Sequence, residues 1–215
     1  MAKLLEASAE DAIAERFCAT WQRCAPGDSD TNTRAIWQQV RGHYNETHRR
    51  YHTLEHIAHC LNELDGARHL TNEADVIELG IWFHDVIYAA GDADCNEARS
   101  AELLRTLARG LMPDDIAARV EALILATTHA GPEDDAAVQI MVDIDLSSIG
   151  LAWTVFLENS KAIQHEQQLP PEAEDAFLTT LERREQIYHT DHFHSRLESS
   201  ARQNIARYRA VCTGK

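Results

Sequence analysis

The chain has 215 residues, of which 44% are hydrophobic and 26% charged, an ordinary composition for one globular domain with a well-buried core. Its 35 acidic and 20 basic residues give a formal charge of -15, which argues against a nucleic-acid polymer or an anionic membrane as a partner, because both bind basic surfaces. Small phosphorylated substrates stay open, since a bound metal supplies positive charge that a residue count ignores.

The cysteines and the N-terminal residues bear on the cellular compartment. Five scattered cysteines without a Cys-x-x-Cys pair indicate reduced thiols. The N-terminus lacks an apolar signal core, because Glu6, Glu10 and Asp11 interrupt it, and the uncharged stretch 146–157 is too short to span a bilayer. We therefore expect a soluble, cytoplasmic protein, with the oligomeric state open and a homodimer among the alternatives.

Hydrophobic periodicity predicts helices along nearly the whole chain. In chain order they lie over 8–24, around 36–44, after an N-cap at Thr53, over roughly 72–90, around 96–109, from Pro113, over 135–146, after Gly150, after Pro171 and over about 192–211. All five prolines fall at these boundaries, and no segment alternates with the period of two typical of strands. The sequence therefore predicts an all-α fold, with a single compact helical domain over 1–215.

The most informative pair is His84-Asp85, which follows the apolar run 81–83 and is expected inside the helix over 72–90. A carboxylate beside a large apolar surface is costly unless a cation compensates it, and a metal ion is the strongest compensator. His52 and His56 are four residues apart, so their side chains face the same way if both are helical or nearly so.

Two further carboxylates, Asp143 and Asp145, lie on a separate predicted helix. Helices of a bundle can direct such side chains to one point, as in many metal sites of bundle cores. Two nitrogen and two oxygen donors suit Mn²⁺, Fe²⁺, Co²⁺, Ni²⁺ or Zn²⁺ better than Ca²⁺. The expected cofactor is one such divalent metal, at least one per chain, with Mg²⁺ as a further alternative.

The ordered motifs of the chain resemble a known family. They are Tyr51-His52-x-x-x-His56-Ile57, Trp82-Phe83-His84-Asp85-x-x-Tyr88, Asn96-Glu97-x-x-Ser100-Ala101 and Asp143-x-Asp145-Leu146-Ser147. Together they resemble the HD superfamily of metal-dependent phosphohydrolases, and more closely a bacterial branch of it that is known mostly by its motifs. The resemblance covers roughly 37–151.

The resemblance implies a helical bundle of the HD type and a set of metal ligands. Asp143 and Asp145 both compete for the last ligand position, and because residues two apart on a helix point to different sides, only one is expected to bind. The Asp-Leu-Ser context favours Asp145. The implied metal ligands are His56, His84, Asp85 and Asp145.

The implied reaction is hydrolysis of a phosphate ester or anhydride of a nucleotide or similar small phosphorylated metabolite by metal-activated water. His52 would protonate the leaving oxygen, as the first histidine of a similar arrangement does in cyclic-nucleotide phosphodiesterases. Asp85 would bridge metal and water. Glu97, also expected to be catalytic, or Asp143 would hydrogen-bond a ligand histidine.

Other residues are expected at the rim of this site. Arg50, with Arg49 before it, is a candidate for contacting a substrate phosphate, and Tyr88 and His129 are further substrate-binding candidates. The chain lacks the extra paired histidines of strictly two-metal HD enzymes, a gap that His129 or Glu97 fills only in part.

Two alternatives remain open. One is a di-iron oxygenase on the same scaffold, for which His129 is the plausible additional ligand. The other is a non-catalytic metal-binding domain that acts as a sensor or interaction module. The histidines at 189, 192 and 194 are interpreted as surface residues, because their spacing near a helix start does not suit a metal site.

Overall fold

The computed structural model describes residues 7–89, 95–131, 134–168 and 171–213. These residues form helices and no strand, which confirms the predicted all-α class. The helices are α1 (Ala7–Cys24), α2 (Asp30–Tyr44), α3 (Leu54–Ala67), α4 (Ala74–Phe83), α5 (Asn96–Ala108), α6 (Asp114–Ala126), α7 (Ala136–Leu146), α8 (Trp153–Gln167), α9 (Pro171–Glu182) and α10 (Asp191–Thr213), with 3-10 turns η1 (Arg68–Leu70) and η3 (Ser147–Gly150).

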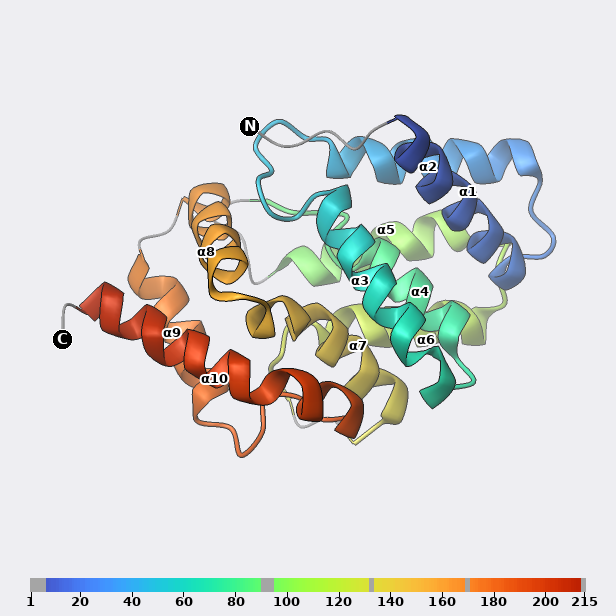
Figure 1. The fold of residues 1–215 in the computed structure, drawn as a ribbon. Helices are drawn as coiled ribbons and strands as arrows, with labels where there is room; N and C mark the ends of the chain where they lie inside the picture. The colour runs from blue at the N-terminus through green and yellow to red at the C-terminus, as the bar shows by residue number, and fades with distance from the viewer. Residues whose placement is uncertain (1–6, 90–94, 132–133, 169–170, 214–215) are drawn as a thin grey trace.

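Helix α4 forms the centre of the core. It packs against α1, α3, α5, α6 and α7, and its residues 76–83 are all buried. This stretch is apolar apart from Glu78 and Gly80, and a helix with so few polar side chains has to be surrounded by other helices, which explains its central place. Helices α1 and α2 lie at one end of the molecule, and α8, α9 and α10 lie at the other (Figure 1).

The helix starts follow local capping rules. The predicted N-cap of α3 is confirmed, because the Thr53 hydroxyl accepts a hydrogen bond from the Glu55 amide at 3.3 Å. Asp135 caps α7 by accepting from the amides of Ala137 and Val138, both at 3.0 Å. These caps set where α3 and α7, two of the helices that carry site residues, begin.

Helix α4 is shorter than predicted, because it ends at Phe83 instead of continuing to about residue 90. His84 is its C-cap, and Asp85 lies in the following turn. The buried guanidinium of Arg49 donates to the carbonyl oxygens of Asp85 at 2.7 Å and Val86 at 2.9 Å. Arg49 thus satisfies two carbonyl groups that would accept backbone hydrogen bonds if the helix continued. The helix can therefore end at His84-Asp85.

Two glycines mark the closest contacts between helices. A Cβ at Gly80 of α4 would lie 3.3 Å from Leu123 Cβ in α6. A Cβ at Gly150, at the end of η3, would lie 2.7 Å from Leu197 Cβ in α10, closer than Cβ atoms approach in proteins. The absence of a side chain at Gly150 therefore lets α10 pack directly on η3.

Within the described ranges, no single helix has the length and apolarity to cross a membrane. One helix pair, Ala136–Gly150 with Trp153–Gln167, reaches that length and composition together, but it bends by 108° at the break.

Candidate metal centre

Four of the predicted ligands converge at one point of the core. His56 comes from α3, His84 and Asp85 come from the end of α4, and Asp145 comes from the last turn of α7. One ligand atom from each residue lies within 4.8 Å of all the others. The side chains of His56, His84 and Asp85 are buried, and that of Asp145 is partly buried.

Hydrogen bonding orients His84 toward this cluster. Its Nδ1 lies 2.9 Å from the carbonyl oxygen of Ile81. Because a carbonyl oxygen can only accept, Nδ1 carries the proton and Nε2 faces the cluster. A backbone carbonyl thus provides the contact that was expected from Glu97 or Asp143.

The spacing of the donor atoms fits one divalent metal ion. The Nε2 atoms of His56 and His84 are 3.2 Å apart, close to the ~3 Å between two adjacent imidazole ligands at ~2.1 Å from one metal. Asp85 Oδ2 lies 2.8 Å from His84 Nε2 and 3.5 Å from His56 Nε2. Asp145 Oδ1 lies 3.4 Å and 3.5 Å from the same two nitrogens. The donors therefore surround one common point.

The charges of the cluster are coupled. Burial lowers the pKa of His84, but Asp85 and Asp145 raise it well above its ordinary value, so a metal would displace a proton from this ring. Burial opposes ionisation of Asp85, but the neighbouring His84 holds the pKa of this carboxyl below its usual range. Burial acts likewise on Asp145, whose pKa is nevertheless held well below the ordinary value by hydrogen bonds, first of all with His129. Burial lowers the pKa of His56 and so favours its neutral, metal-binding form.

His52 lies beside the cluster but outside it. His52 directly precedes Thr53, the N-cap of α3. Its ring stacks on the ring of Tyr88, with the centroids 4.0 Å apart. Its Nε2 is 3.9 Å from Asp85 Oδ2, and its Nδ1 is 3.3 Å from Glu166 Oε2. The imidazole thus lies between the Asp85 carboxylate of the four-residue cluster and a second carboxylate on its other side.

Glu166 of α8 is this second carboxylate, and sequence reasoning missed it. It is 1% exposed, and its Oε2 accepts hydrogen bonds from the amides of Arg50 at 3.2 Å, Tyr51 at 2.8 Å and His52 at 3.2 Å. Burial raises the pKa of Glu166, but the contact with His52 and these amide donors lower it to about 2. No local pattern signals this role, because the partners are 114 to 116 residues away in the sequence.

His129 contacts the cluster through Asp145. It follows α6 in a left-handed conformation with φ of 55°, which is uncommon for a residue other than glycine. Its Nε2 lies 3.0 Å from Asp145 Oδ2, and its carbonyl oxygen accepts a hydrogen bond from Arg184 at 2.7 Å. Asp145 therefore directs Oδ1 at the histidines of the cluster and Oδ2 at His129.

Asp143 is not part of the cluster. Its fully buried carboxylate accepts hydrogen bonds from the amides of His189 at 2.7 Å and Thr190 at 2.8 Å, and from the Thr190 hydroxyl at 2.7 Å. These hydrogen bonds connect the segment 189–190, just before α10, to α7. The histidines at 189, 192 and 194 likewise lie outside the four-residue cluster.

The two arginines before the motif have different places. Arg49 is buried, and its guanidinium donates to backbone carbonyl groups, among them that of His52 at 3.0 Å. Arg50 donates to the carbonyl oxygens of Thr47 and Arg49, both at 2.7 Å, and lines a neighbouring cavity that includes His56. Arg50 does not line the cavity that contains Asp85 and Asp145, so its contact with a substrate phosphate stays a prediction.

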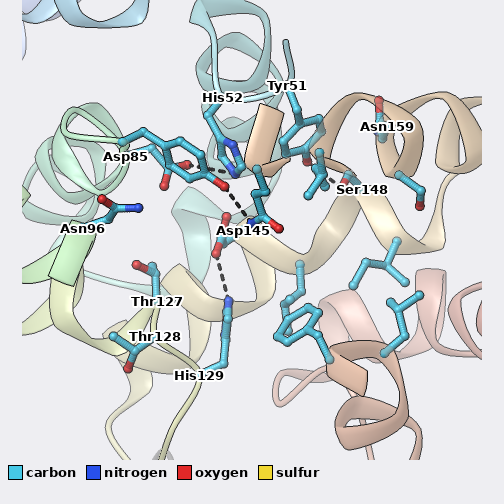
Figure 2. Close-up of a pocket in the computed structure, with 18 of the residues that line it drawn as sticks. Tyr51, His52, Asp85, Asn96, Thr127, Thr128, His129, Asp145, Ser148 and Asn159 are labelled. Atoms are coloured by element: carbon cyan, nitrogen blue, oxygen red, sulfur yellow. Dashed lines mark hydrogen bonds and ion pairs between the residues drawn. The ribbon is translucent and has the colours of Figure 1, made fainter. Parts of the chain in front are cut away.

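A cavity of about 270 Å³ opens beside the cluster. His52, Asp85, Asp145 and His129 reach it from different elements, as Figure 2 shows. The other lining residues are Tyr51, Tyr88, Asn96, Glu97, Thr127, Thr128, Leu146, Ser148, Ile149, Phe156, Asn159, Ser160, Ile163, Gln167, Phe177 and Leu178.

Two of the other predicted residues therefore border this space. Glu97, in the first turn of α5, is half-buried, and burial raises the pKa of its carboxyl. The hydroxyl oxygen of Tyr88 accepts a hydrogen bond from Gln167 at 2.7 Å.

No family model matches this chain, and no curated protein or solved structure is significantly similar to it. The fold and the site define an all-α protein with a buried His/Asp cluster that could hold a metal ion. The resemblance to the HD superfamily is therefore carried by the motif residues alone.

Proposed function

We propose that this protein is a metal-dependent phosphohydrolase of the HD type, acting on a phosphate ester or anhydride of a nucleotide or similar small metabolite. One observation carries the proposal. The four-residue cluster borders a cavity, and His52, which has the anionic partner Glu166, lines the same cavity next to the cluster. This arrangement supports the proposal, because phosphoryl activation and protonation of a leaving group would need such groups around one space.

The metal would be held by His56, His84, Asp85 and Asp145. A divalent ion bound there supplies Lewis-acid polarisation of a phosphoryl oxygen and lowers the pKa of a water molecule. His129 keeps Asp145 in one orientation through its bond to Oδ2, and the carbonyl of Ile81 does the same for His84.

His52 would be the general acid. Its Nδ1 lies next to the anionic Glu166, and its Nε2 faces the side of Asp85. A proton held at Nε2 is then available for the leaving oxygen of a substrate in the cavity. Stacking on Tyr88 fixes the plane of the ring.

A single metal is favoured over a di-iron centre. Among the described residues, one group of His, Cys, Asp and Glu side chains has its ligand atoms close enough together for a metal ion. His129 contacts Asp145 but does not belong to that group. The described part of the chain therefore supplies none of the additional ligands that the oxygenase alternative needs.

Elemental analysis of untagged protein, purified without chelator, tests the proposal together with a screen of phosphate esters and anhydrides. We expect about one Mn, Fe, Co, Ni or Zn per chain and hydrolysis in the wild type, and neither metal nor hydrolysis in Asp85→Ala. Asp115→Ala, which removes an exposed carboxylate from the first turn of α6, is the matched control and should keep both properties.

Circular dichroism of Asp85→Ala shows whether the variant is folded, so that loss of metal is not confused with loss of structure. Two irons per chain without phosphate hydrolysis would favour the oxygenase. Protein that stays free of metal after reloading would overturn the proposal.

A further inference from the structure

The cavity beside the metal centre contains carboxylates but no lysine or arginine among its described lining residues. Asp85, Glu97 and Asp145 line it, whereas no lysine or arginine does. The stretches 90–94, 132–133 and 169–170, for which the structure gives no description, contain no lysine or arginine in their sequence either.

The basic residues of neighbouring segments are directed elsewhere. The guanidinium of Arg49 is buried against backbone carbonyl groups, and Arg184 donates to the carbonyl of His129. Arg50 lines the neighbouring cavity, and Lys161 of α8 is exposed. None of these four lines the cavity of the metal centre.

Apolar and uncharged polar side chains from the C-terminal half line the remaining part. Helix α8 contributes Phe156 and Ile163, and α9 contributes Phe177 and Leu178. Asn159, labelled at the edge of Figure 2, adds a neutral donor and acceptor. This surface suits a ring or an aliphatic body with hydroxyl or amide groups, and the volume of about 270 Å³ is near the lower end of the ~300–1,000 Å³ typical of ligand pockets.

Charge balance then limits the number of phosphate groups. A divalent ion and the carboxylates of Asp85 and Asp145 cancel, so one phosphoryl dianion faces His52 and His129 as its remaining partners. Each further phosphate adds negative charge to a cavity whose described lining offers no lysine or arginine to receive it, and uncompensated like charge is a strong means of rejecting a ligand.

We propose, on the basis of the proposed function, that this site takes a phosphate monoester with an uncharged, partly apolar body up to the size of a nucleoside. It discriminates against the di- and triphosphates of the same body. The absence of Lys and Arg from the described lining is the feature that sets this preference.

Hydrolysis by the metal-loaded full chain should be compared for phenyl phosphate, adenosine monophosphate and adenosine triphosphate. We expect kcat/KM for the monophosphates to exceed that for the triphosphate at least about 10-fold, which corresponds to about 1.4 kcal/mol in transition-state binding. Equal or faster hydrolysis of the triphosphate would overturn the charge preference and leave the phosphohydrolase proposal intact. Failure to hydrolyse any phosphate ester would overturn the phosphohydrolase proposal.

A binding measurement decides the charge preference without turnover. The increase in Tm caused by phenylphosphonate should exceed that caused by the β,γ-methylene analogue of adenosine triphosphate at equal concentration. The reverse order would count against the inference even if no substrate is hydrolysed.

A charge variant tests the cause. Asn159→Lys places a cation on the cavity wall and should raise the triphosphate-to-monophosphate ratio of kcat/KM several-fold. Thr154→Lys adds the same charge at an exposed position of the same helix that does not line the cavity, and should leave the ratio unchanged. An unchanged ratio in Asn159→Lys would show that charge does not set the preference.

Discussion

At the residue scale, the contact between His52 and Glu166 would separate proton transfer from metal binding in the proposed function. Glu166 contacts His52 and three backbone amides, and the four-ligand cluster does not include it. Its carboxylate acts through the imidazole, so it is a positioning residue. Changes at Glu166 should therefore leave metal content unaltered while they alter turnover.

We expect Glu166→Gln to lower kcat about 10–100-fold, the usual effect of removing a group that supports a functional histidine. The neutral amide removes the negative charge next to His52 Nδ1. The loss should fall on kcat and not on KM, because Glu166 does not line the cavity. Metal stoichiometry should stay at the wild-type value. Glu158→Gln, an exposed change on the same helix, is the control, and an unchanged kcat in Glu166→Gln would contradict the role.

A second prediction for a single residue concerns Asp28, which lies far in sequence from the four-residue cluster. Burial opposes its ionisation, but hydrogen bonds, first of all from Asn32, keep the pKa of this carboxyl below its ordinary value. Its contribution to stability is therefore complete above the unfolded-state pKa of about 3.9 and is lost as the pH falls through the lower folded-state pKa. Its donors are Trp21 Nε1, the Ser29 amide and Asn32 Nδ2, each at 2.8 Å, and Thr33 Oγ1 at 3.2 Å.

We expect Asp28→Asn to lower the free energy of unfolding by about 1–2 kcal/mol at pH 7. The difference from wild type should shrink as the pH falls below about 4, because the wild-type carboxylate is then protonated as well. Urea denaturation at pH 7 and at pH 3 measures both values. A difference that stays constant between them would show that the charge of Asp28 is not involved.

At the scale of elements, Glu78 joins α4 to α1 and η1. Its carboxylate is 0% exposed and accepts from Arg16 Nε at 2.9 Å and Thr20 Oγ1 at 2.7 Å, and it also pairs with Arg68. The exposed pair of Arg23 and Asp75 connects the same two helices at 2.8 Å. The two contacts therefore offer a comparison between a buried and an exposed ion pair.

Glu78→Ala should lower the free energy of unfolding by about 2–4 kcal/mol, because it leaves buried donors without their acceptor. Asp75→Ala, the matched exposed change, should cost no more than about 1 kcal/mol. Chemical denaturation of both variants tests the order. Equal decreases in the free energy of unfolding would mean that the buried carboxylate of Glu78 contributes no more to stability than the exposed one of Asp75.

Packing of α10 on η3 gives another prediction at this scale. Gly150→Ala should cost about 1–3 kcal/mol, because the new methyl group overlaps Leu197. Gly42→Ala in α2, where a Cβ meets nothing within 4 Å, should instead be neutral or stabilising by about 0.5–1 kcal/mol. If Leu197→Ala does not recover part of the loss in the double variant, overlap is not its cause.

At the scale of the whole molecule, the features that could be predicted from the sequence are those set locally. Helix periodicity, the Thr53 cap and the adjacency of His84 and Asp85 each depend on residues a few positions apart, and the structure contains all of them. The end of α4 and the role of Glu166 depend on partners 36 to 116 residues away. No local pattern encodes such pairings. The predicted continuation of α4 to about residue 90 is therefore wrong, because the helix ends at Phe83.

Helix α8 carries Glu166 behind His52 and also supplies Phe156, Asn159 and Ile163 to the cavity wall. One rigid element thus has a part in both the proposed proton donor and the space available to a ligand. In an enzyme built this way, a substitution that tilts α8 to admit a larger substrate also draws the carboxylate away from the imidazole. Substrate range and turnover would then change together under selection, and relatives with broader specificity would need a second compensating change to keep their speed.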